Sequence, residues 1–211
     1  AHFVLGPPRG RSVASDRPGA TEMAGSITLE RGEGDGVAFL TLSHPGKLNA
    51  IDVAMWRELH ALMLHLQSLP AEQAPHAVIV RGAAGQFASG GDIVEFASFR
   101  FEEHSLRDFH ENVVAPALHA LLDCDIPLYA QIEGACIGGG LEIAACCDIR
   151  ICGEGSRFGV PIARLGFPMA PLELDVVARV ASEPLLREML LEARLLTAAA
   201  ALQHGLVHAV V

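Results

Sequence analysis

Residues 134–148, GACIGGGLEIAACCD, constrain the fold more than any other part of the chain. Glycines 138–140 run into a small-residue, apolar segment that contains a single carboxylate, Glu142. A buried carboxylate is costly unless it is paired, hydrogen-bonded or protonated. The pattern therefore predicts a tight glycine turn followed by a buried helix from Leu141, and the rest of the chain must explain why an acid stands in the first turn.

Composition narrows the class of protein. The chain has 211 residues, 51% of them hydrophobic, which is enough for one domain with a large core. The net charge is −10 with Lys47 as the only lysine, so we expect neither nucleic acid nor an anionic membrane as a partner. The five cysteines form no CxxC pair and indicate reduced thiols in an intracellular, cytoplasmic protein. No run of about 18 uncharged apolar residues is present, so we predict no membrane span.

The order of elements indicates an α/β fold. Strands are expected at 26–32 and 36–44 around a turn, then at 76–82, 127–135 and 148–153. Helices are expected at 52–69 with Asp52 as N-cap, at 105–124 with a kink or break at Pro116, after the glycine turn, and through most of 172–204. Residues 1–25 are interpreted as a disordered extension or leader, and 26–211 as one domain.

Two glycine-containing loops have the same kind of potential anion-binding site. FASGGD (87–92) and CIGGGLE (136–142) each bring small residues to a strand-to-helix junction, where unpaired backbone N–H groups and the helix dipole attract anions. One N–H from each loop would form an oxyanion hole for an enolate or a tetrahedral oxygen. Taken alone, each motif also fits a simpler explanation: a tight turn, an Asp N-cap, or a dipole-favoured glutamate.

The order and spacing of four motifs, taken together, indicate a family resemblance. HPGKLNAI, GQFASGGDIVEF, the long segment from IEGACIGGGLE to RFGVPIARLGFP, and LLTAAAALQHGLV together resemble the enoyl-CoA hydratase/isomerase (crotonase) superfamily. The resemblance covers about residues 27–211. It implies a crotonase-like spiral of repeated β-β-α units, usually assembled as homotrimers or hexamers, that binds acyl-CoA thioesters.

The resemblance also implies roles for particular residues. By position, the oxyanion-hole N–H groups belong to Ser89 and Gly139, and Glu142 matches the first of the two catalytic glutamates of the hydratases. The residues that line the CoA groove would be Lys47, Asn49, Ala50, Gly91, Asp92, Ile93 and Gly138. Coenzyme A enters as part of the substrate, and we expect no other cofactor and no metal.

One departure from the family pattern bears on the reaction. FGVPIARLG has Ile162 where the hydratases carry their second glutamate, so hydration would need another group. Candidate substitutes are Arg164, Glu102, Glu103, His104, Asp108 and His110. The sequence also stops at Val211, before the helices that in the family complete the pocket and contact neighbouring subunits, so either these helices are short or absent, or the sequence omits a tail.

The leading hypothesis is an acyl-CoA enzyme of the hydratase/isomerase type that stabilises a thioester enolate with one glutamate, Glu142, as proton shuttle. Decarboxylation or C–C cleavage of an acyl-CoA, which needs one proton donor, is the alternative among enzymes. A non-catalytic homologue that binds CoA thioesters is the alternative from another class, and Ile162 favours it.

Overall fold

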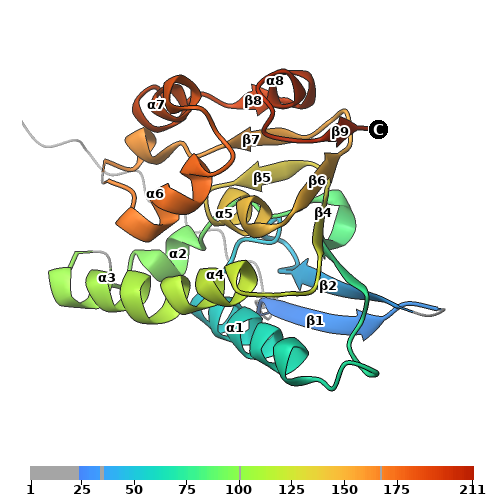
Figure 1. Ribbon diagram of the computed structural model, residues 1–211. Coiled ribbons are helices and arrows are strands. Elements are labelled where there is room, and N and C mark those ends of the chain that lie inside the picture. The colour runs from blue at the N-terminus through green and yellow to red at the C-terminus, as the bar shows by residue number, and fades with distance from the viewer. Residues whose placement is uncertain (1–23, 34–35, 100, 167) are drawn as a thin grey trace, which may run out of the picture.

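The structure is a computed structural model that describes residues 24–33, 36–99, 101–166 and 168–211 (Figure 1). Most of the expected extension at 1–25 therefore lies outside the described residues, and its disorder stays a prediction. The described part is a mixed α/β domain, as the sequence predicts.

The main sheet has six strands in the order β1-β2-β3-β4-β6-β9. Their bounds are β1 Ser26–Arg31, β2 Val37–Ser43, β3 Ala77–Gly82, β4 Leu128–Ile132, β6 Ile149–Cys152 and β9 Ala209–Val210. β1 and β2 form the expected antiparallel hairpin, and every other neighbouring pair is parallel. The carboxyl ends of the parallel strands therefore share one edge, where the two glycine loops begin.

A second, three-stranded sheet has the order β5-β7-β8, with β5 Ala135–Ile137, β7 Arg157–Gly159 and β8 Leu196–Thr197. The single strand expected at 127–135 is wrong. The chain turns at Gly134, where φ is +59°, and continues as β5 in the other sheet. Glycine adopts this conformation without the strain that a Cβ would cause. Alternation between the two sheets gives the repeated β-β-α arrangement.

Helices fill the connections. They are α1 Val53–Ser68, α2 Ile93–Phe96, α3 Glu103–Phe109, α4 Ala115–Leu122, α5 Gly139–Cys146, α6 Pro171–Ala178, α7 Glu183–Leu191 and α8 Ala198–Gln203. Asp52 caps α1 by accepting from the Met55 N–H at 2.8 Å, as predicted. The expected helical run 172–204 is interrupted by β8, and α5 begins two residues before Leu141.

The kink expected at Pro116 takes the form of a π-helical turn, His110–Val114, between α3 and α4. Proline lacks the N–H that would bond one turn back, and a wider turn before it avoids the clash of its ring with the preceding carbonyl. The turn changes which side of the helix His110 and the residues before it present.

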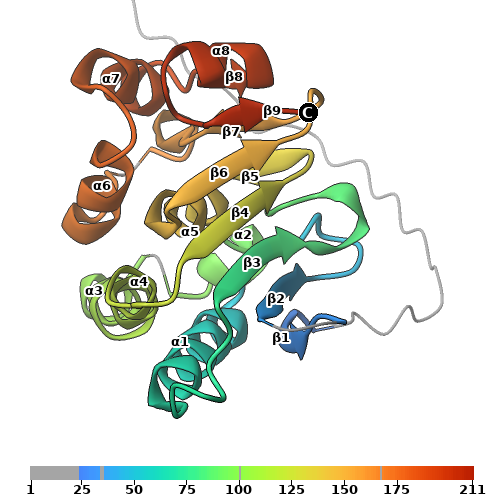
Figure 2. The same ribbon diagram turned by 45° about the vertical axis from the view of Figure 1, so that its right-hand side comes forward.

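The core lies between the main sheet and the helices α1, α4 and α5, which cover the same side of it (Figure 2). All five cysteines are unpaired thiols, as expected, and four of them are buried. No helix in the described part of the chain is both long and apolar enough to cross a bilayer.

We expect Leu59→Ala in α1 to lower the free energy of unfolding by about 2–5 kcal/mol, because Leu59 is fully buried and truncation leaves a cavity. Leu64→Ala on the same helix is the matched control, since Leu64 is 49% exposed. It should change stability by roughly 0.5 kcal/mol or less. Urea unfolding of both variants measures this, and equal losses would contradict the packing described.

Candidate active site

The two glycine loops lie side by side. The Ala88 N–H donates to the Ala135 carbonyl at 2.8 Å, and the Ile137 N–H donates to the Ala88 carbonyl at 3.0 Å. Beyond this pairing, Gly90 and Gly138 both have positive φ, and a Cβ on Gly138 would lie 3.6 Å from the Gly90 Cα. The backbones therefore approach to van der Waals contact at the start of α5.

The backbone N–H of Ser89 does not point toward the start of α5. The N–H donates to the Leu48 carbonyl at 3.0 Å, and the Ser89 hydroxyl donates to the Lys47 carbonyl at 3.0 Å. Both groups are committed to the preceding loop. The structure therefore does not support the expectation that Ser89 supplies an oxyanion-hole donor.

Gly91 is the residue that turns a donor toward α5. Ile51 pairs with this segment through the Gly90 carbonyl at 2.8 Å and the Asp92 N–H at 2.9 Å. Because backbone groups alternate along an extended chain, the Gly91 N–H points to the opposite side. Gly91 also lines the pocket, and a Cβ on it would meet nothing within 4 Å.

The second loop contributes the backbone N–H of Gly139. Gly139 is the first residue of α5, and a first-turn N–H has no acceptor within its own helix. Among the described residues, no acceptor bonds the N–H of Gly91 or of Gly139. The Gly138 N–H, by contrast, donates to the Gly159 carbonyl at 2.9 Å. Two unpaired donors thus come from the two loops that the sequence singles out, with Gly91 in place of Ser89.

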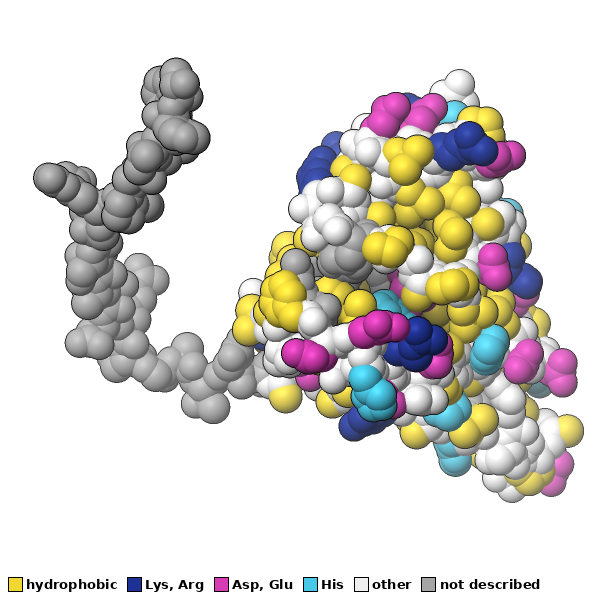
Figure 3. All heavy atoms as spheres, turned by 90° about the vertical axis from the view of Figure 1, so that its left-hand side faces the viewer, with side chains coloured by type: hydrophobic (Ala, Val, Ile, Leu, Met, Phe, Trp, Pro, Cys, Tyr) yellow, Lys and Arg dark blue, Asp and Glu magenta, His cyan; other side chains and the backbone are white. Residues whose placement is uncertain are grey.

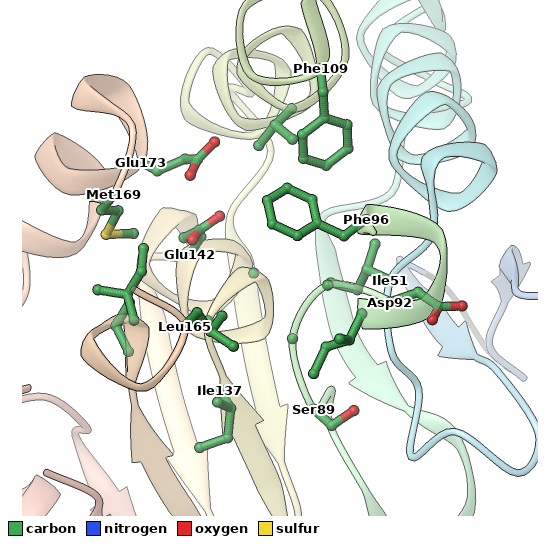
Figure 4. A pocket seen from close by; sticks show the side chains of 18 of the residues that line it. Ile51, Ser89, Asp92, Phe96, Phe109, Ile137, Glu142, Leu165, Met169 and Glu173 are labelled. Carbon is green, nitrogen blue, oxygen red and sulfur yellow. The ribbon is translucent and has the colours of Figure 1, made fainter. Parts of the chain in front are cut away.

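Both loops open on a pocket of about 330 Å³ with mainly apolar walls (Figure 4). Its apolar lining includes Ile51, Trp56, Phe96, Phe99, Phe109, Val114, Ile137, Val160, Ile162, Leu165 and Met169. Such a lining accepts an acyl chain and excludes water, which strengthens electrostatic interactions inside.

Glu142 lies in this pocket on α5, one turn after the Gly139 N–H, and is 6% exposed. Burial, and then the nearby charge of Glu173, raise the pKa of Glu142 well above the ordinary carboxyl value of 4.5. A carboxyl group with a raised pKa can hold and release a proton near neutral pH, which suits general acid–base catalysis.

The sequence reasoning missed Glu173. This residue stands on α6, is 7% exposed and lines the same pocket, and Figure 4 shows its carboxylate and that of Glu142 on one side of it. Its Oε1 lies 2.5 Å from Nδ1 of His110, which also lines the pocket. The sequence pattern alone predicts no more for Glu173 than an acid that favours the first turn of a helix, here the helix that begins at Pro171. Only the packing of α6 against α5 turns it inward.

The other proposed substitutes for a second acid, apart from Arg164, lie outside this pocket. Glu103 forms an exposed ion pair with Arg107, and His104 and Asp108 line a separate surface hollow. Glu102 is exposed and absent from the pocket lining. Arg164 does line the pocket, but its guanidinium donates to the Ala193 carbonyl at 3.2 Å.

The residues expected in a CoA groove divide into two groups. Asn49 is 4% exposed, and its side-chain amide donates to the carbonyls of Ala83 and Gln86 at 2.9 and 2.7 Å, so it fixes the loop from inside. Ala50 is also buried. These two positions support the groove rather than face a ligand.

Gly91, Asp92 and Ile93 lie at the pocket, and Ile93 is 61% exposed. Lys47 Nζ lies 2.7 Å from Asp92 Oδ2. Burial raises the pKa of the Asp92 carboxyl, but hydrogen bonds from Lys47 and from the Val94 N–H outweigh this and hold it below 3.8. The Asp92 carboxylate therefore stays charged at neutral pH beside Lys47.

Two adjacent glycine loops with unpaired backbone donors beside a buried glutamate form an arrangement that can stabilise negative charge on an oxygen atom. The family model described as enoyl-CoA hydratase/isomerase matches residues 32–211. The chain belongs to this family.

Relatives and solved structures agree. A probable enoyl-CoA hydratase of Rhizobium meliloti (strain 1021) is 31% identical over 175 residues, covering 83% of this chain and 65% of that protein. A mitochondrial delta(3,5)-delta(2,4)-dienoyl-CoA isomerase of Mus musculus is 30% identical over 181 residues, covering 81% of this chain and 54% of that protein. This chain thus spans less than two thirds of the length of these curated relatives.

Among solved structures, an enoyl-CoA hydratase/carnithine racemase from Magnetospirillum magneticum superposes with a TM-score of 0.81 at 37% identity. The match covers 87% of this chain and 67% of that one. A putative enoyl-CoA hydratase/isomerase family protein from Hyphomonas neptunium superposes with a TM-score of 0.80 at 30% identity. That match covers 88% of this chain and 69% of the other. The predicted family and the crotonase-like fold are confirmed.

The raised pKa of Glu142 predicts how stability depends on pH. Above the unfolded carboxyl value, the folded state keeps a proton on Glu142 that the unfolded state releases, so stability falls as pH rises toward the folded pKa. Relative to Glu142→Gln, the parent protein should lose stability progressively as the pH rises above the ordinary carboxyl value of 4.5. Urea unfolding at a series of pH values above this one measures the difference, and a constant difference would contradict the raised pKa.

Proposed function

We propose that this protein binds an acyl-CoA thioester with its carbonyl oxygen at the N–H groups of Gly91 and Gly139, and stabilises the enolate that forms there. Glu142 exchanges a proton with the carbons next to that carbonyl. The observation that carries the proposal is the pair of unpaired N–H groups beside a buried carboxyl in an apolar pocket. Two such donors stabilise developing oxyanion charge by several kcal/mol.

Hydration or isomerisation of an enoyl-CoA is the reaction that we propose. The names of the relatives, a probable enoyl-CoA hydratase and a dienoyl-CoA isomerase, support this pair of reactions. Coenzyme A enters as part of the substrate, and proton transfer with backbone donors needs no further cofactor and no metal. A cytoplasmic location stays a prediction, and some relatives are named as mitochondrial.

Decarboxylation or C–C cleavage would need only one proton donor, and a non-catalytic homologue would need none. The presence of a second carboxyl group, Glu173, beside Glu142 favours hydration or isomerisation over both. A panel of acyl-CoA thioesters, assayed for hydration, isomerisation and CoA release, decides between these reactions.

Gly91→Pro removes one proposed donor, and we expect turnover to fall by about 10²–10³-fold. Gly91→Ala is the matched control, because it keeps the N–H and its Cβ enters open space. Steady-state kinetics on an active acyl-CoA measure both variants. Equal turnover of the two variants would remove Gly91 from the oxyanion hole.

Glu142→Gln keeps the size of the side chain but cannot exchange a proton, so turnover should fall by about 10²–10⁴-fold. Affinity for the CoA thioester should survive, since backbone groups hold the carbonyl. Kinetics and calorimetric binding separate the two effects. If every acyl-CoA reaction keeps the parent rate, Glu142 is a structural residue of the first helical turn.

We also propose assembly into a homotrimer or a hexamer. Exposed apolar side chains remain on α7 and after it, with Leu191 74% and Leu195 41% exposed. Hydrophobic side chains also gather on the face that Figure 3 shows. Contiguous apolar surface of this kind marks protein interfaces. Light scattering at micromolar concentration tests the assembly, and a monomer would contradict it.

A further inference from the structure

Six ionisable side chains line the pocket among the described residues. Three of them are bonded to groups outside its interior: Asp92 to Lys47 Nζ, Glu95 to the Val53 N–H, and Arg164 to the Ala193 carbonyl. Glu142, Glu173 and His110 remain. The proposed function assigns a proton-transfer step only to Glu142, so the roles of Glu173 and His110 need an account.

We propose that Glu173 is the second proton-transfer residue of this pocket and that His110 is the residue that positions it. This inference rests on the proposed function. Ile162 also lines the pocket, from the loop before α6, and brings no ionisable group there. The second carboxyl group is then supplied by α6 instead of by the loop.

The geometry of Glu173 fits a catalytic acid or base. Its carboxylate is buried, faces the pocket beside Glu142 and is close enough to raise the pKa of that residue (Figure 4). With two carboxyl groups at one pocket, one can serve as acid while the other serves as base.

His110 holds Glu173 in place. Besides the 2.5 Å contact through Nδ1, its ring packs edge-on against Phe109, with centroids 5.1 Å apart, and against Phe96 at 6.5 Å. These contacts fix the ring plane, and the π-helical turn that begins at His110 fixes its backbone. A carboxylate bonded to a ring held in this way keeps one orientation, which proton transfer requires.

Burial and the charge of Glu173 both favour the protonated form of Glu142, so Glu142 is the acid at rest and Glu173 the base. In the hydration of a 2-enoyl-CoA, Glu173 takes a proton from water as the water oxygen bonds to C3. The C2–C3 double-bond electrons pass into the thioester enolate, and Glu142 then gives its proton to C2. One water is consumed, and one proton has moved from Glu142 to Glu173.

Two measurements separate the roles of the carboxyl groups. Exchange of the C2 proton of butyryl-CoA with D₂O needs the oxyanion donors and one base, whereas hydration of but-2-enoyl-CoA needs both carboxyl groups. We expect Glu173→Gln to lower hydration by about 10²-fold or more while C2 exchange is kept. Exchange should even rise, because removing the Glu173 charge lowers the pKa of Glu142. Glu142→Gln should lose both reactions.

Asp175→Asn is the matched control, since Asp175 stands on the same helix and is exposed. It should keep both rates, and thermal unfolding shows whether each variant folds. Hydration by a folded Glu173→Gln within about threefold of the control would overturn the role of Glu173. Loss of C2 exchange together with hydration in that variant would overturn it too, since Glu173 would then act through the structure of the site. If the parent shows neither reaction, the proposed function itself fails, and this inference with it.

His110 is tested by two replacements. Asn keeps an N–H donor near the position of Nδ1, whereas Leu removes it. We expect His110→Leu to lower kcat for hydration by about tenfold or more with little change in KM, and His110→Asn to recover most of it. C2 exchange should persist in both. Equal kcat values for the two variants would overturn the positioning role.

Discussion

The approach of two backbones at Gly90 and Gly138 is the constraint on which the rest of the site depends. Pairing of Ala88 with β5 brings the loops together, and a Cβ on Gly140 would lie 2.7 Å from the Ala88 carbonyl oxygen, closer than side chains approach. The glycines therefore let α5 start directly against the neighbouring loop. As a result, the first N–H of a helix and the N–H of Gly91 open on the same pocket, and Glu142 follows one turn later.

The same contact explains why a buried acid is tolerated. All of α5 is buried, so Glu142 has little contact with solvent, and its ionised form is disfavoured by burial and by Glu173. Keeping the proton avoids most of the cost of burying a charge. At higher pH the proton is lost, and the buried charge then lowers the free energy of unfolding. A reactive group in the core thus reduces stability, as is common at active sites.

The sequence predicts those parts of the molecule that local chemistry determines. Periodicity and capping locate α1 and all strands of the main sheet except β9, and the glycine loops locate Gly139 and Glu142. Two features escaped because their cause is not local. The Ser89 N–H is bonded to the Leu48 carbonyl, whereas pairing of the neighbours of Gly91 with Ile51 leaves the Gly91 N–H unbonded among the described residues. These pairings join segments that are distant in the sequence, so the sequence does not show which of the two N–H groups is available. The split of residues 127–135 into two strands depends on the position of the second sheet.

Glu173 shows the same limit at the level of chemistry. The local pattern at Ile162 indicates a missing acid, yet the pocket contains a second carboxyl group from a helix that follows in the chain. A carboxylate on residue 162 would add a third carboxyl group to the apolar cavity that already holds Glu142 and the charge of Glu173, and like charges in low dielectric repel strongly. An apolar residue at 162 and an acid at 173 are therefore mutually consistent. The chemistry depends on all the side chains that face the cavity, and a single position in a sequence motif does not show which ionisable groups are present there.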